Sequence, residues 1–365
     1  MNRPLTIGRH TVRFPLVQGG MGVRVSGGRL AGHVARCGGV GLVASAGLGL
    51  SSPHAETHGY YAASARSLQD EIRRAYAIAP DGVVGVNCMV AVSDYDDLVQ
   101  AACQAGAKVV VSGAGLPLNL PALTKDYPDV ALVPIVSSVR AAELVGRKWH
   151  KHFDRLPDAV VVEDPETAGG HLGEKLENIG TGAYDQYATV AGVRAFFQER
   201  FGRAVPVIAA GGIWDRADLL HALARGADGV QMATRFVCTE ECDADEAFKQ
   251  AYLRATRDDI GLIMSPAGLP GRALIGNVEA IGARDRGQGR GCSAACLKKC
   301  AYREGRERFC ILYALDRAYR GDTDTGLVFC GSNAWRAERI ATVREIFDEL
   351  FELAASDETA EVVNG

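Results

Sequence analysis

Short runs of β-branched and apolar residues recur along roughly the first 240 positions, and stretches with helical apolar spacing separate them. The runs lack the alternation of apolar and polar positions that marks a half-exposed strand, so both faces of each strand should be buried. Strands that alternate with helices in this way are typical of a parallel sheet. Eight strands are predicted, at residues 12–18, 39–44, 82–88, 108–112, 130–136, 159–163, 205–210 and 228–232.

The helices expected between these strands complete a repeating strand–helix unit. Asp94 is a suitable N-cap for one of them and Gly106 a suitable stop. Eight strands with seven crossovers favour a closed (β/α)8 TIM barrel, with an open doubly wound sheet as the alternative. Helices are predicted at 28–37, 66–78, 94–105, 138–149, 185–201 and 214–226.

The remainder of the chain departs from this period. We expect the barrel to occupy residues 1–237 and a substrate or lid segment, rich in proline and glycine near its end, to occupy 238–285. A cysteine-rich helical tail should follow at 286–365, because five of the ten cysteines are crowded between Cys292 and Cys330. Within the tail, residues 335–353 have the spacing of an amphipathic docking helix.

Composition narrows the class of protein. A hydrophobic content of 47% is ordinary for a globular chain, and a net charge of −4 favours neither nucleic acid nor an anionic membrane surface. The first ten residues lack the apolar core of a signal peptide, and the apolar run 39–50 is too short to span a bilayer. A cytoplasmic protein with a small-molecule substrate is expected, and a homodimer is left open.

Glycine-rich turns follow several of the predicted strands. Gly19-Gly20, Gly170, Gly211-Gly212 and Ala233-Thr234 all lie at carboxyl ends of strands, where barrel enzymes keep their active sites. Such turns let backbone N–H groups approach a phosphate or a flat ring closely. There is no P-loop lysine and no GxGxxG in a Rossmann context. The pattern favours a phosphate-bearing cofactor, but it does not separate a flavin from a phosphosugar.

Seven blocks, in order, give the chain a more specific resemblance over roughly residues 12–280. Together they resemble the nitronate monooxygenase family, formerly called 2-nitropropane dioxygenases, which also includes the barrel-type enoyl-ACP reductases. This resemblance implies FMN on a TIM barrel. The blocks are Val17–Val23, Gly38–Gly47, Gly85–Asn87, Ser112–Gly115, Ala168–His171, Ala209–Ile213 and Gly226–Phe236.

Cofactor contacts follow from the resemblance, position by position. It implies that Gly19, Gly20 and Met21 pack along the flavin ring, that Asn87 bonds its polar edge and that Gly170 lies under it. The residues implied for the ribityl phosphate are Gly211, Gly212, Gln231, Ala233 and Thr234, although the family usually has glycine where this chain has Ala233.

His171, directly after two glycines, is the expected catalytic base, because a neutral imidazole can accept a proton near pH ~6.5. The leading interpretation is an FMN-dependent nitronate monooxygenase that oxidises alkyl nitronates, or nitroalkanes, with O2 to a carbonyl compound and nitrite. The alternatives are an enoyl-thioester reductase that uses NADH or NADPH, and a non-catalytic, metal-stabilised binding protein. An IMP dehydrogenase is disfavoured, because Gly169-Gly170-His171 stands where that enzyme needs a cysteine.

Three further residues are candidates for substrate contact. Glu163 ends the sixth strand and either faces the barrel mouth or forms an internal salt bridge. Ser265 and Arg272 belong to the proline- and glycine-rich loop and are suited to an anion or to the phosphate end of a pyridine nucleotide.

Cys292, Cys296, Cys300 and Cys310 form a candidate iron–sulfur or zinc site. On one continuous helix the first and third of them would be ~12 Å apart, too far for a single ion, so a metal requires an irregular path. Buried thiols that pack the tail against the barrel are the alternative. Cys330 is expected to be a small core residue.

Overall fold

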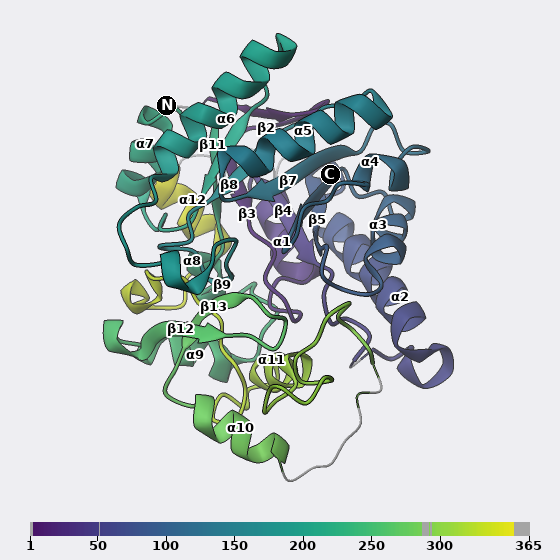
Figure 1. Ribbon diagram of the computed structural model, residues 1–365. Helices are drawn as coiled ribbons and strands as arrows, with labels where there is room; N and C mark the ends of the chain where they lie inside the picture. The colour runs from purple at the N-terminus through teal and green to yellow at the C-terminus, as the bar shows by residue number, and fades with distance from the viewer. Residues whose placement is uncertain (1–2, 51, 287–291, 293, 354–365) are drawn as a thin grey trace, which may run out of the picture.

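The computed structural model describes residues 3–50, 52–286, 292 and 294–353. Eight parallel strands close into a barrel in the order β10-β11-β3-β4-β5-β6-β7-β8, which confirms the predicted (β/α)8 fold (Figure 1). All eight predicted strands are present, each within a few residues of its expected bounds. They are β3 (Leu16–Gln18), β4 (Val40–Ala44), β5 (Val83–Met89), β6 (Val109–Gly113), β7 (Ala131–Val136), β8 (Val160–Glu163), β10 (Val207–Ala210) and β11 (Gly229–Met232).

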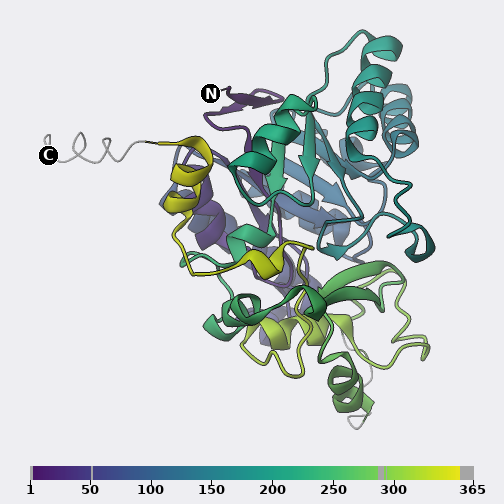
Figure 2. The same cartoon turned by 90° about the vertical axis from the view of Figure 1, so that its left-hand side faces the viewer.

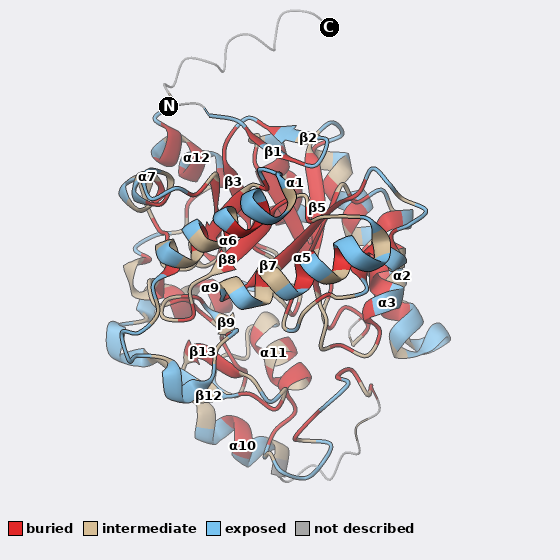
Figure 3. Cartoon of the chain, turned by 45° about the horizontal axis from the view of Figure 1, so that its top comes forward, coloured by how far each residue is buried: buried red, intermediate tan, exposed pale blue. Residues whose placement is uncertain are grey.

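Helices surround the barrel, with buried inner faces and exposed outer faces (Figure 3). Polar residues fix where they begin: the Asp185 side chain accepts the N–H groups of Tyr187 and Ala188, and Asp215 and Asp218 form a capping box. Asp94 is the N-cap residue of α3, as predicted. The helices are α1 (Gly28–Arg36), α2 (Ala55–Ile78), α3 (Tyr95–Gln104), α4 (Leu120–Leu123), α5 (Val139–Phe153), α6 (Gln186–Phe201), α7 (Arg216–Ala224) and α8 (Thr234–Val237).

Two elements near the N-terminus differ from the prediction. The expected strand 12–18 is divided: β2 (His10–Val12) pairs antiparallel with β1 (Leu5–Ile7), and only β3 joins the barrel. Pro15 separates the two parts, and its ring nitrogen has no N–H to donate to a neighbouring strand. Helix α2 begins well before the predicted residue 66, and Gly59 interrupts it with a φ of +70°.

The segments after β11 cover the barrel face at the carboxyl ends of the strands (Figure 1). β13 pairs with both β12 and β9, the short strand that follows β8, so this layer is hydrogen-bonded to the loop that carries His171. The elements not yet given are β9 (Gly170–His171) and η1 (Leu176–Asn178), which lie between β8 and α6 in the chain, and those that follow α8: α9 (Glu246–Arg254), η2 (Arg257–Asp259), β12 (Ile260–Met264), β13 (Pro270–Leu274), α10 (Val278–Arg286), α11 (Ile311–Tyr319), η3 (Ala334–Arg336) and α12 (Val343–Phe351).

The chain finally returns to the barrel wall through α12 (Figure 2). The Phe351 ring stacks on Phe14 with centroids 4.3 Å apart, so this helix docks as predicted. It is shorter than the expected 335–353, because Ala341 bridges to Thr239 and the helix starts only at the Thr342 cap. No helix among the described residues is long and apolar enough to cross a membrane.

Candidate active site

A narrow cavity of about 110 Å³ lies among the glycine-rich turns at the barrel mouth. Gly211 and Gly212, which line this cavity, take φ values of +98° and +69°, which residues with side chains rarely adopt. The residues expected to bind phosphate all line it. They are Gly211, Gly212, Gln231, Ala233 and Thr234, and Gly19 and Gly20 lie on the same wall.

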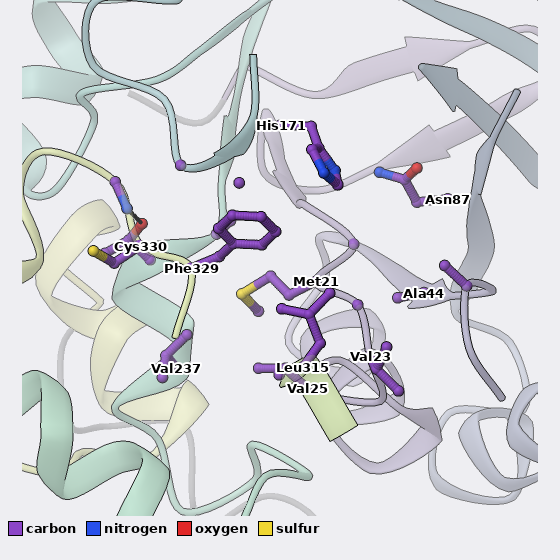
Figure 4. Close-up of a pocket in the computed structure, with 18 of the residues that line it drawn as sticks. Met21, Val23, Val25, Ala44, Asn87, His171, Val237, Leu315, Phe329 and Cys330 are labelled. Carbon is purple, nitrogen blue, oxygen red and sulfur yellow. Dashed lines mark hydrogen bonds between the residues drawn. The ribbon is translucent and has the colours of Figure 1, made fainter. Parts of the chain in front are cut away.

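A wider and more apolar cavity of about 200 Å³ adjoins the narrow one. Gly20, Asn87 and Glu163 line both, so the two form one elongated space. Met21 and His171 line the wider part (Figure 4), and Gly170 lines it as well. Only glycine fits at position 20, since a Cβ there would lie 2.3 Å from the Asn87 Cβ.

The residues present fit a flavin mononucleotide. The wide end offers apolar walls for a ring, and the narrow end offers glycine backbone for a phosphate. The Gln231 Oε1 atom is buried at the narrow end without a hydrogen-bond partner among the described residues. A buried carbonyl oxygen without a donor is costly, so a ligand donor at this place would be stabilising. The methyl group of Ala233 narrows the cavity but leaves it open.

The segment Phe329–Asn333 was not predicted to belong to the site, yet it lines both parts of the cavity. Gly331 donates its N–H to Thr234 Oγ1 at 3.0 Å, and Asn333 Nδ2 donates to the Gly212 carbonyl at 2.7 Å. Cys330 is buried, as expected, and together with Phe329 and Gly331 it lines the wide cavity. The signal that could have revealed them is the Gly331-Ser332-Asn333 turn after an apolar run, the same pattern as the barrel turns.

His171 lies in β9 and faces the wide cavity (Figure 4). Its Nε2 shares a 2.7 Å hydrogen bond with Ser265 Oγ, which also accepts the N–H of Ala267 at 3.1 Å. Burial lowers the pKa of His171 to about 4, since a charged imidazole is disfavoured away from water. The ring is therefore neutral at physiological pH, with one nitrogen held by the β12–β13 hairpin.

Replacing Ser265 by alanine should lower kcat about 5- to 10-fold, the effect of one lost hydrogen bond of about 1 kcal/mol, with little change in KM. The physical reason is that His171 loses the contact that fixes its ring. Steady-state kinetics of Ser265→Ala and Ser265→Thr measure it, and the threonine variant should recover most of the rate. A rise in KM at constant kcat would instead mean that Ser265 contacts substrate.

Glu163 ends β8 and lines the wide cavity. Of the two positions considered for it, the barrel mouth and an internal salt bridge, it occupies the first. Burial raises the pKa of Glu163 to about 8, the neighbouring Asp164 adds to the rise, and Arg272 opposes it. The carboxyl is therefore protonated at neutral pH. A neutral acid at this place does not repel an anionic substrate.

Arg272 occupies a different position from the expected substrate contact. Its side chain is buried, and its guanidinium donates hydrogen bonds to the carbonyls of Ala168 and Pro165. It lines none of the cavities described here. Arg272 thus braces the loop before His171.

A third and larger cavity, of about 730 Å³, meets the site at Glu163 and His171. Ser137, Ser138 and Lys175 contribute polar groups to its wall. Its apolar residues include Leu116, Leu172, Leu176, Met264 and Leu269. The site therefore has room beside the imidazole for a substrate longer than a small nitro compound.

Of the five tail cysteines, Cys330 lines the wide cavity, and the other four line none of the three cavities of the site. Cys296, Cys300 and Cys310 are buried and Cys292 is half-buried. Within the described part of the chain, no three histidine, cysteine or acidic side chains lie close enough to hold a single metal ion. The geometry of these described residues therefore does not support a structural zinc ion bound by the tail cysteines.

Several known proteins are similar to this chain in sequence or in structure. A dehydrogenase of Mycobacterium tuberculosis, named for a hydroxy-methyl-oxo-octahydroindene-carboxyl-CoA substrate, is 30% identical over 263 residues, covering 72% of this chain but only 63% of the relative. A probable nitronate monooxygenase of Bacillus subtilis is 34% identical over 122 residues, 33% of each chain. The structure of FabK from Thermotoga maritima matches with a TM-score of 0.69 and 26% identity, covering 93% of this chain and 92% of FabK.

The sequence model of the nitronate monooxygenase family matches residues 3–352, nearly the whole described chain. That span includes the barrel turns, the hairpin that holds His171 and the Phe329–Asn333 segment. The chain therefore belongs to the nitronate monooxygenase family.

Proposed function

We propose that this protein binds FMN in the elongated cavity and oxidises alkyl nitronates, and nitroalkanes after deprotonation, with O2. The observation that carries the proposal is a neutral, half-buried imidazole, His171, that faces an apolar cavity next to a narrow, glycine-lined end. The products are a carbonyl compound and nitrite. A cytoplasmic location and a homodimer stay predictions.

Bound FMN would supply the electron acceptor of the reaction. Gly19, Gly20 and Met21 would lie along its ring, and Gly211 and Gly212 would approach its phosphate. Asn87 and Gln231 would offer amide groups to its polar atoms, and Ala233 and Thr234 would close the phosphate end. The remaining chemistry belongs to side chains of this chain.

His171 is the group that moves a proton. In the tautomer whose Nε2–H donates to Ser265 Oγ, Nδ1 carries no proton, and Nδ1 is the atom we assign to removal of the α-proton from a nitroalkane. A nitronate arrives without that proton and needs His171 only for contact. Protonated Glu163 leaves the negative charge of a nitronate unopposed by a second anion.

A second candidate is oxidation or reduction of a thioester, including NADH- or NADPH-dependent enoyl-thioester reduction. The large, mostly apolar cavity beside His171 and Glu163 favours it, because a long acyl chain would fill this space. The relative from Mycobacterium tuberculosis, whose name includes a carboxyl-CoA substrate, supports the same candidate. The same imidazole would then face the carbon next to the thioester carbonyl.

Anaerobic stopped-flow spectroscopy separates the two. The flavin absorbance of the purified protein is expected to bleach rapidly with propionate 3-nitronate and slowly with NADH or NADPH. Re-admission of O2 should restore the spectrum and release nitrite. Rapid bleaching by a pyridine nucleotide, followed by reoxidation with an enoyl-CoA, would replace the first proposal with the second.

A further inference from the structure

Cys292, Cys296, Cys300 and Cys310 can bind a metal group together only if the chain between them follows an irregular path, and it does so. Between α10 and α11 the described residues form no helix, so Cys292, Cys296 and Cys300 are not spread along a helical face. Instead the chain turns back at Ala295, which has a φ of +45°. The Ala295 N–H then points at the Cys292 sulfur, at 3.3 Å. An N–H directed at sulfur stabilises a thiolate more than a thiol.

This irregular loop is firmly attached to the barrel. The Ser93 N–H donates to the Cys296 carbonyl at 2.9 Å, and the Lys298 N–H donates to the Ala91 carbonyl at 3.0 Å. At its end, Ala301 donates its N–H to the Pro266 carbonyl at 2.8 Å, next to Ser265 of the active site. Backbone hydrogen bonds to the segments around Ser93 and Pro266 therefore fix the position of the chain that carries these cysteines.

Cys310 is the N-cap residue of α11, the helix that follows this loop. The backbone N–H groups of Leu312 and Tyr313 and the sulfurs of Cys292 and Cys300 all lie close enough to its sulfur to interact with it electrostatically, while burial of the thiol raises the pKa of Cys310. Cys296 in turn is within range of all three other sulfurs. Three of the four side chains are buried in one apolar cluster, with Leu297, Phe309 and Leu312 around them.

Thiols collected in this way are poorly explained as packing alone. Ordinary core packing needs no N–H group directed at a sulfur, whereas the Ala295 N–H points at the Cys292 sulfur. A single ion is disfavoured by the distances among the described residues. An iron–sulfur cluster is larger than one ion, so it holds its cysteine ligands further apart.

We propose that Cys292, Cys296, Cys300 and Cys310 bind one [4Fe–4S] cluster. Each thiol releases its proton, and the four thiolates each bind one iron atom. The cluster would fix the 292–310 loop, and through the Ala301–Pro266 bond it would also steady the hairpin that carries Ser265. This inference is independent of which substrate the flavin site accepts.

Iron and acid-labile sulfide, measured on the protein purified without oxygen, test the proposal. About four of each per chain are expected, with an electron paramagnetic resonance signal after reduction by dithionite. Cys296→Ser should lose most of the iron. Cys103→Ser, which changes an equally buried thiol on α3, should keep it.

Reconstitution of the wild-type chain keeps the test decisive if Cys296→Ser fails to fold. After incubation with Fe²⁺ and sulfide, alkylation of the native protein should spare Cys292, the half-buried member of the four, whereas the untreated native protein should be labelled there. Wild-type protein that holds no iron after reconstitution, or that holds zinc instead, would overturn the proposal. Iron lost equally from Cys103→Ser would overturn it as well.

Discussion

Replacing His171 by alanine is expected to leave flavin bound while turnover of a neutral nitroalkane falls about 10²- to 10⁴-fold, the usual range for a general base. Flavin should remain because its cavity is built mainly from glycine turns, Met21 and Asn87. The rate should fall because, among the described residues that line the wide cavity, His171 alone offers a neutral ring nitrogen. Turnover of the matching nitronate, already deprotonated, should fall much less.

The pH dependence of kcat/KM gives a second measure of the same residue. Since burial lowers the pKa of His171 to about 4, protonation should abolish nitroalkane turnover only as the pH approaches 4. The unfolded chain takes up this proton near its ordinary value of 6.5, so stability should also fall as the pH drops from 6.5 to 4. His171→Ala should remove that part of the pH dependence.

His152→Ala is the matched control, because this histidine is exposed on α5. It should match the wild-type chain in flavin content and in both rates. Equal losses on nitroalkane and nitronate in His171→Ala would contradict the base assignment and leave His171 as a contact residue. Unchanged nitroalkane turnover would remove it from the reaction.

The barrel could be predicted from sequence because each of its strands is buried on both faces. Val40–Ala44 and Val160–Glu163, for example, are almost continuously apolar, and such short runs between helical patterns have few other interpretations. The length of the first strand was overestimated, because apolar character alone does not show that the residues before Pro15 pair in a separate two-stranded sheet. The glycine-rich turns that line the narrow cavity could be located from their position after these strands.

The contribution of the tail to the site could not be predicted in the same way. Phe329–Asn333 lies about 100 residues beyond the last barrel strand, and local patterns do not reveal contacts across such distances. Arg272 illustrates the converse problem, since a cation in a glycine-rich loop suggests an anion, whereas its partners here are backbone carbonyls. Side-chain direction, which decides between these roles, is not encoded in residue type or spacing.

Replacing Gly169 by alanine should have the other large effect, loss of bound flavin together with turnover. A Cβ at this position would lie 2.4 Å from the Cys330 carbonyl carbon and 2.5 Å from the Gly331 nitrogen. Both are backbone atoms, so the Phe329–Asn333 segment must shift as a unit, at a cost of about 1–3 kcal/mol. The shift would break the bond from Gly331 to Thr234 and open the phosphate end of the cavity. Flavin titration should show at least about 10-fold weaker binding, which corresponds to about 1.4 kcal/mol.

Gly276→Ala separates this effect from the general cost of losing a glycine. Gly276 is exposed, and a Cβ there would meet nothing within 4 Å. Flavin affinity and melting temperature should therefore match those of the wild-type chain. If Gly169→Ala kept full flavin affinity, the 329–333 segment would be a mere neighbour of the cofactor cavity. Weaker flavin binding with an unchanged melting temperature would show instead that the tail closes the cofactor site without being needed for the fold of the barrel.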